Sequence, residues 1–153
     1  MIALVQRSLE AQVTVAEKCV GKIDRGLAVF LGVVQEDMRE HAALLARKIA
    51  ALRIFEDENG KMNRSILETG GKVLAISNFT LCANAKKGTR PSYDRAMRPQ
   101  GAMELYDFFC DELLKNGVSA VEKGVFGAYM QVSVCGDGPV SIVLDTEQLM
   151  PKS

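Results

Sequence analysis

Two long apolar runs separated by a helical pattern constrain the fold of this chain more than any other feature. "GLAVFLGVV" covers residues 26–34 and "KVLAISNFTLCA" covers residues 72–83. An apolar run of this length, bounded by glycine or by polar residues, is typical of a buried central strand. Between the runs, apolar residues such as Leu45 and Ile49 recur at helical spacing, which predicts a helix near residues 37–52.

Shorter patterns complete the expected fold. Strand-like runs begin the chain as "IALVQR" and "AQVTV", Asn59-Gly60 marks a turn, and residues 83–99 read as a long loop. A second helix is predicted to end at Asn116-Gly117. Its apolar stripe consists of Leu105, Phe108, Phe109, Leu113 and Leu114. Two last strands are expected near residues 129–135 and 140–145. The order predicts a single α/β domain, residues 1–153, with a mixed β-sheet, two main helices packed on one side, and a tail at 147–153.

Composition excludes several function classes. Lysine plus arginine number 19, as do aspartate plus glutamate, so no global charge attracts nucleic acid. His41 is the only histidine and is expected on an exposed helix face, which argues against Ser-His-Asp and Cys-His hydrolases and against catalytic zinc. The four dispersed cysteines are expected to be reduced core residues. Dinucleotide and P-loop motifs are absent, so we expect no cofactor and no metal.

No basic leader precedes a long apolar run, and no apolar run reaches the roughly 20 residues of a membrane span. We therefore expect a cytoplasmic protein with no membrane partner.

The long loop contains the densest basic cluster of a chain that is neutral overall. Lys86, Lys87 and Arg90 lie close together, with Tyr93 three residues further on. Basic side chains beside an aromatic ring suit phosphate contact combined with base stacking. A solvated loop is an equally good interpretation of the same pattern.

Two further stretches carry unusual residues for their positions. Ser77, Asn78 and Thr80 place polar groups at the end of an apolar strand, where Thr80 is also explained by β-propensity alone. Later, residues 136–139 (Gly-Asp-Gly-Pro) interrupt a strand pattern. They suit a hairpin turn, but a Gly-Pro bond also permits a cis peptide that presents two carbonyls on one side.

Together these blocks resemble the D-aminoacyl-tRNA deacylases, also called D-tyrosyl-tRNA deacylases. The resemblance spans nearly the whole chain: "MIALVQR", "GLAVFLGV", "RIFEDENGKMN", "SNFTL", "GTRPSY", "LYDFF" and "MQVSV" followed by "DGPV". The family's signatures are a Ser-Gln-Phe-Thr-Leu strand end and an Asn-x-Gly-Pro-Val-Thr segment. This chain has Asn78 in place of the glutamine, Gly136 in place of the asparagine, and Ser141 in place of the last threonine.

The resemblance implies a homodimeric enzyme that hydrolyses the ester between a D-amino acid and the 3′-terminal adenosine of tRNA. It implies a cis Gly138-Pro139 bond that enters the partner's site and excludes L-amino acids, so that glycine, as in glycyl-tRNA(Ala), escapes the filter. It places Ser77, Asn78, Phe79 and Thr80 in the catalytic site, makes Arg7 a brace for the Gly-Pro segment, and gives Lys86, Lys87 and Arg90 to the tRNA.

Two mechanisms fit this reading. Thr80 attacks as a nucleophile, or the tRNA 2′-hydroxyl assists a water molecule while the N–H groups of Phe79 and Thr80 stabilise the oxyanion. The scarcity of acid-base side chains favours the second. The alternatives are a related editing deacylase for another mischarged aminoacyl-tRNA and a non-catalytic tRNA-binding dimer.

Overall fold

The two apolar runs form adjacent parallel strands at the centre of the sheet. β3 (Gly26–Gly32) pairs with β6 (Lys72–Ser77), with Leu27 beside Val73 and Leu31 beside Ser77, in a computed structural model that describes residues 1–151. The connection between them contains α1 (Arg39–Ala51), which confirms the predicted helix. The other elements are β1 (Ile2–Val15), β2 (Lys18–Ile23), β4 (Phe55–Glu56), β5 (Met62–Arg64), α2 (Ile66–Thr69), η1 (Phe79–Cys82), α3 (Pro99–Lys115), β7 (Val121–Lys123), β8 (Gln131–Asp145) and α4 (Thr146–Leu149).

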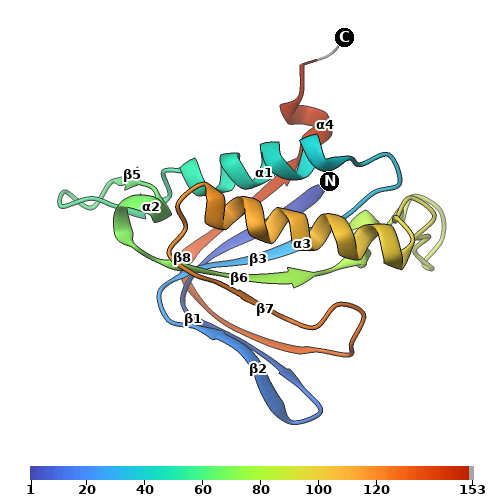
Figure 1. Cartoon of the computed structure of the whole chain (residues 1–153), viewed down its shortest axis with the longest axis horizontal. Helices are drawn as coiled ribbons and strands as arrows, with labels where there is room; N and C mark the ends of the chain where they lie inside the picture. The colour runs from blue at the N-terminus through green and yellow to red at the C-terminus, as the bar shows by residue number, and fades with distance from the viewer. Residues whose placement is uncertain (152–153) are drawn as a thin grey trace.

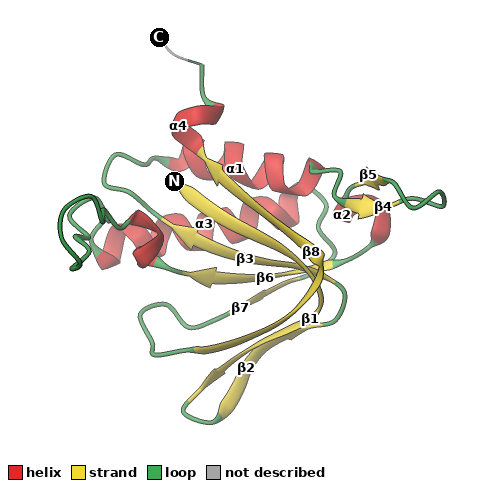
Figure 2. Ribbon diagram, turned by 180° about the vertical axis from the view of Figure 1, so that it is seen from behind, coloured by secondary structure: helices red, strands yellow, loops and turns green. Residues whose placement is uncertain are grey.

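The mixed α/β architecture is confirmed. Strand order in the main sheet is β2-β1-β3-β6-β7, and β8 also pairs with β1. The β3–β6 and β6–β7 pairs are parallel, whereas β1 is antiparallel to each of its partners. The main helices α1 and α3 lie side by side on one face, and the sheet curls away from them through β1 and β2 (Figures 1 and 2).

The sheet has an apolar cluster on each face. Along β6, Val73 and Ala75 face the cluster beneath α1 and α3, whereas Leu74 and Ile76 face a second cluster enclosed by the curled strands. This arrangement explains why β3 and β6 are continuously apolar, because a strand covered on both sides has no solvent face.

The first and last strands differ from the expectation that each would be two short strands. β1 and β8 are single long strands, but each changes its buried face part-way along. Val132 and Val134 pack on the curled-strand cluster, while Val140 and Ile142 pack on the helix-side cluster. Residues of equal parity normally share a face, so extra residues must intervene, and the β1–β8 register shifts twice between Gln6 and Glu10.

Other elements also differ in extent from the expectation. β2 and β7 were not expected as strands, and α3 begins at Pro99, several residues before the apolar stripe. The first residues of the expected tail belong to α4, and Leu149 packs against the core. Cys82 and Cys110 are buried as expected, but Cys19 and Cys135 are exposed. Within residues 1–151, every helix is too short or too polar to cross a membrane.

Candidate active site

The carboxyl ends of β3 and β6 meet, and the chain then turns sharply into η1. Asn78 N–H donates to the Leu31 carbonyl at 2.8 Å, which ties the end of β6 to β3. Gly32 makes this close approach possible. A Cβ atom there would lie 3.0 Å from Leu81 Cβ and 3.1 Å from the Asn78 carbonyl oxygen. The residues after β6 are therefore held by backbone packing against the end of β3.

A cleft of about 650 Å³ opens at these strand ends. Ser77, Asn78 and Phe79 line it, and so does Tyr93, whose ring packs edge-on against Phe79 with 5.2 Å between centroids. The remaining lining residues are almost all apolar. They come from the end of β3 and the residue after it, from β6, from α3 and the loop before it, and from the start of β8 and the segment before it: Phe30, Leu31, Val33, Ile76, Ala96, Met97, Pro99, Ala102, Tyr106, Phe126, Gly127, Ala128, Tyr129, Met130 and Val132. The cleft suits a flat or apolar group better than a charged one.

The sequence did not indicate the wall formed by residues 126–130. Tyr129 belongs to this wall and has 89% of its surface accessible. The available signal was a glycine between Phe126 and Ala128 just before a strand. That pattern predicts a turn but not that the turn faces η1.

Thr80 and Asn78 are joined by a short hydrogen bond. Thr80 Oγ1 donates to Asn78 Oδ1 at 2.6 Å, and the Thr80 side chain is exposed. An amide oxygen accepts a hydrogen bond but does not remove a proton at neutral pH. Asn78 therefore orients the hydroxyl group of Thr80 without activating it as a nucleophile.

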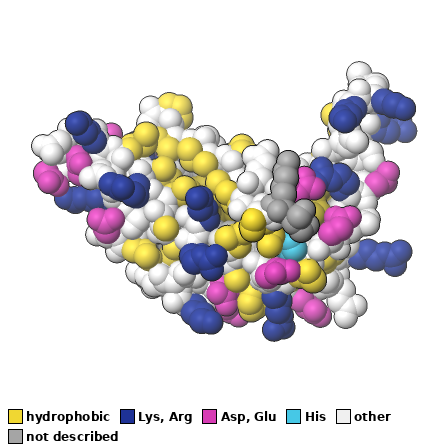
Figure 3. Space-filling view, turned by 90° about the horizontal axis from the view of Figure 1, so that it is seen from above, with side chains coloured by type: hydrophobic (Ala, Val, Ile, Leu, Met, Phe, Trp, Pro, Cys, Tyr) yellow, Lys and Arg dark blue, Asp and Glu magenta, His cyan; other side chains and the backbone are white. Residues whose placement is uncertain are grey.

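The basic loop forms a projecting tongue next to this cleft. Asn84 and Ser92 exchange two backbone hydrogen bonds of 2.8 Å, which close the base of the tongue. Lys86, Lys87 and Arg90 lie between them, all exposed and without an ion pair to any residue in 1–151. The loop occupies the right-hand end of the molecule in Figure 1, where Figure 3 shows a projecting lobe with basic side chains.

Two ionisable side chains close to the cleft, Cys82 and Tyr106, are buried. Burial raises the pKa of the Cys82 thiol, and it raises the pKa of the Tyr106 phenol well above its usual value. Tyr106 also donates to the Ala75 carbonyl at 2.7 Å. His41 is outside the cleft and accepts the Met38 N–H at the start of α1. Among residues 1–151, no Asp, Glu, His, Lys or Arg lines the cleft.

The Gly138-Pro139 bond is cis, and both residues are exposed. Beside it, the buried Arg7 side chain donates from Nε to the Asp137 carbonyl at 3.1 Å and lies 3.3 Å from the Asp137 carboxylate. Arg7 Nη1 donates to the Ile54 carbonyl at 2.8 Å. One guanidinium group thus connects the Gly-Pro segment to the loop after α1.

Within one chain, the Gly-Pro segment and the cleft lie near different ends of β3. Arg7 pairs with Leu27, whereas the cleft begins at Phe30 and Leu31. The four residue steps from Leu27 to Leu31 span about 13 Å of extended strand. Neither Gly138 nor Pro139 is among the residues that line the cleft.

Comparison with known proteins places these features in a family. A family model described as "D-Tyr-tRNA(Tyr) deacylase" matches residues 4–145. The chain belongs to this family, and it is an ester hydrolase of the deacylase type. The D-aminoacyl-tRNA deacylase of Thermus aquaticus is 51% identical over 148 residues, covering 97% of each chain, and that of Bacillus cytotoxicus is 50% identical over 147 residues, covering 96% of this chain and all of the other.

Solved structures agree on the fold. A structure titled "c-Myc DNA Unwinding Element Binding Protein" superposes with a TM-score of 0.90 at 39% identity and covers 95% of this chain and 98% of its own. A probable eukaryotic D-amino acid tRNA deacylase has a TM-score of 0.80 at 16% identity, with coverage of 94% and 97%. The second likeness concerns the fold alone.

Proposed function

We propose that this chain hydrolyses the ester joining a D-amino acid to the 3′-terminal adenosine of tRNA, in the cytoplasm, to give free D-amino acid and tRNA. The observation that carries the proposal is the apolar cleft beside Ser77, Asn78 and Phe79 in a member of the deacylase family. Such a cleft suits an adenine ring and an aminoacyl group.

The proposed chemistry uses the substrate's own ribose, because none of the described residues that line the cleft is a side-chain base. Water adds to the ester carbonyl carbon, negative charge develops on the carbonyl oxygen, and the bond to the ribose 3′ oxygen then breaks. The N–H groups of Phe79 and Thr80 stabilise that charge, since the first positions of a helix leave their N–H groups without an intrahelical acceptor. The 2′-hydroxyl orients the water and relays its proton to the leaving oxygen.

Chirality is read by the Gly138-Pro139 segment of a second copy in this proposal. Two observations support a shared site. The segment is distant from the cleft of its own chain, and it is exposed together with Val143, whose accessible fraction is 69%. The carbonyl groups accept hydrogen bonds from the substrate ammonium and occupy the volume that an L side chain would need. A D side chain points away from them.

Glycine is the exception that this filter predicts. Because glycine has no side chain, backbone carbonyls have nothing to exclude, so glycyl-tRNA, including glycine mischarged on tRNA(Ala), is expected to react. Arg7 holds the filter in place through its bonds to Asp137. Lys86, Lys87 and Arg90 contact the phosphates of the acceptor end.

Paired substrates test the function directly. D-Tyr-tRNA and Gly-tRNA should lose their amino acid in the presence of the protein, and L-Tyr-tRNA should not, when each is corrected for spontaneous hydrolysis. Rapid hydrolysis of an L-aminoacyl-tRNA would support the related editing deacylase. Binding of tRNA without turnover would support a non-catalytic binding protein.

Mixing two variants of reduced activity tests the shared site. One chain would carry Asn78→Ala and Phe79→Ala in the cleft, and the other would carry Gly138→Ala in the filter. After subunit exchange, a mixed dimer has one site with an intact cleft and an intact filter, so D-activity should return. If the activity of the mixture stays at the level of the separate variants although native mass spectrometry shows mixed dimers, the two elements act within one chain.

A further inference from the structure

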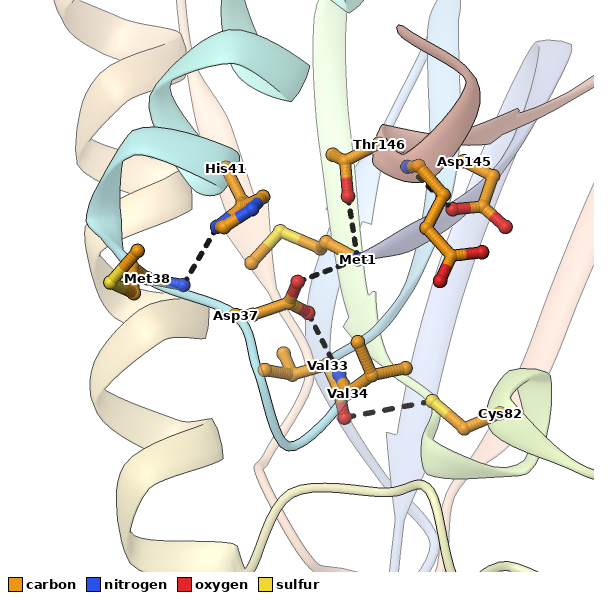
Figure 4. Close-up of polar contacts among 10 residues, drawn as sticks. Met1, Val33, Val34, Asp37, Met38, His41, Cys82, Asp145 and Thr146 are labelled. Atoms are coloured by element: carbon orange, nitrogen blue, oxygen red, sulfur yellow. Dashed lines mark hydrogen bonds and ion pairs between the residues drawn. The ribbon is translucent and has the colours of Figure 1, made fainter. Parts of the chain in front are cut away.

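The α-nitrogen of Met1 is buried and takes part in an ion pair. It donates to Asp37 Oδ1 at 2.8 Å and to Thr146 Oγ1 at 2.8 Å (Figure 4). Only 1% of Met1 is accessible, and Asp37 and Thr146 are buried as well. A charge in such a place is tolerated only with close partners. Nothing in the proposed chemistry uses this group.

Asp37 lies in the loop between β3 and α1, and its side chain connects Met1 to the backbone of that loop. Its second oxygen, Oδ2, accepts the N–H of Val34 at 2.7 Å, so one carboxylate joins Met1 to the segment that follows β3 (Figure 4). Both carboxylate oxygens are therefore engaged by groups on different elements. Removing the ammonium would leave Asp37 as a buried anion with only one of these partners.

The loop fixed by Asp37 in turn holds one wall of the cleft. Val34 forms a bridge with Ala96, Gln35 N–H donates to the Arg95 carbonyl at 2.9 Å, and Met97 N–H donates to the Val33 carbonyl at 2.9 Å. Val33, Ala96 and Met97 line the cleft. A continuous series of hydrogen bonds thus links the α-ammonium to the substrate-binding wall.

We propose that the α-ammonium of Met1, acting through Asp37, is a positioning group for the cleft, and that it must remain unmodified for full substrate binding. An N-formyl group, an N-acetyl group or a preceding residue would convert the ammonium into a neutral amide and add atoms where the structure is closed. Asp37 would then lose its ionic partner, and the wall at residues 95–97 would be held less firmly. The expected effect on substrate binding rests on the proposed function, but the effect on the wall does not.

The experiment compares chains that differ only around this pair. Gly-Ser placed before Met1 removes the charge, and Asp37→Asn keeps the shape of the partner while removing its charge. An equal extension at the carboxyl end controls for added residues. Asp24→Asn, at an exposed carboxylate 3.8 Å from Lys72 Nζ, controls for the loss of one negative charge. Ile66→Val, in the core at α2, provides a mild loss of stability away from the wall.

Two measurements decide the outcome. Both test chains should have a KM for D-Tyr-tRNA about tenfold higher, with a much smaller change in kcat, because the effect is on binding geometry. Hydrogen exchange at the amides of Gln35 and Met97 should become faster in both, and the three controls should match the parent chain. An extended chain with unchanged KM and unchanged protection of these amides overturns the proposal. If the parent chain has no deacylase activity, the proposed function fails, and the exchange rates alone decide this inference.

Discussion

The cleft and the Gly-Pro segment are held in place by different kinds of interaction. Around the cleft, η1 packs closely on Gly32, and many apolar side chains line the cavity. The Gly-Pro segment is exposed, and one buried arginine connects it, through Asp137 of β8, to the loop after α1. A contact made by many apolar side chains weakens only a little when one of them is substituted. A single buried charged group has no neighbour that replaces it when it is removed.

This difference predicts unequal sensitivity to substitution. A single change in the cleft wall removes a small part of a large contact, but a change at Arg7 or Gly138 alters the whole filter. Substitutions at both places test this difference.

Arg7→Ala should have the largest effect. It leaves the Ile54 carbonyl and the Asp137 carboxylate without their donor, and breaking such a buried interaction costs about 3 kcal/mol of stability. The Gly-Pro segment should shift, and a displacement of about 1 Å is enough to lower D-Tyr-tRNA hydrolysis about a hundredfold. Single-turnover kinetics measure the rate and thermal unfolding measures the stability.

Arg7→Lys is the matched control for charge. A lysine retains the cation but cannot donate in the two fixed directions of the guanidinium group, so its activity should remain low. Full D-activity in either folded variant would contradict the role of Arg7 as the brace.

Gly138→Ala should have the next largest effect. Its φ of +127° is unfavourable for a residue with a side chain, and an added Cβ would lie 3.0 Å from Val140 Cγ2 and 3.2 Å from Arg7 Nη2. We expect D-activity to fall about tenfold with little loss of secondary structure. Gly136→Ala is the control, because a Cβ at Gly136 meets no atom within 4 Å. Equal activities of the two variants would show that backbone geometry at Gly138 is unimportant.

The same comparison explains what the sequence could predict about the fold. Periodicity predicted β3, β6, α1 and α3, because each keeps one pattern of burial along its length. It failed for β1 and β8, whose buried faces change where the register shifts, so each resembled two short strands. β7 was missed because three residues at a sheet edge carry too little pattern.

One part of the candidate site could be predicted from the sequence, and the other part could not. The polar strand end at Ser77–Thr80 was visible in the sequence, because polar residues there interrupt an apolar run. The opposite wall, including Tyr129, was not visible, because it is brought to the cleft by packing between segments about 50 residues apart. The Thr80–Asn78 bond also needed coordinates, since it depends on side-chain directions.

Neutralising the basic tongue should have a smaller effect on the chemistry. The variant Lys86→Gln, Lys87→Gln, Arg90→Gln removes three exposed cations without touching the cleft lining. We expect weaker tRNA binding, unchanged single-turnover rates at saturating tRNA, and a salt dependence that is flatter by about 0.7 for each phosphate that the variant no longer neutralises. Lys18→Gln, an exposed lysine of β2, is the control. An unchanged slope would mean that the tongue is only solvated surface.

Thr80→Ala should have the smallest effect, although Thr80 lies at the centre of the strand-end signature. Its hydroxyl donates to an amide oxygen that cannot remove the proton, and the variant keeps the backbone N–H group that the proposed oxyanion site requires. We expect a loss of only about threefold, the amount that one exposed hydrogen bond represents. A substrate with a 2′-deoxy terminal ribose should react far more slowly with the parent chain than the normal substrate does with Thr80→Ala. If Thr80→Ala is inactive while the 2′-deoxy substrate reacts normally, Thr80 is the nucleophile, and the cleft then depends on one side chain as strongly as the filter depends on Arg7.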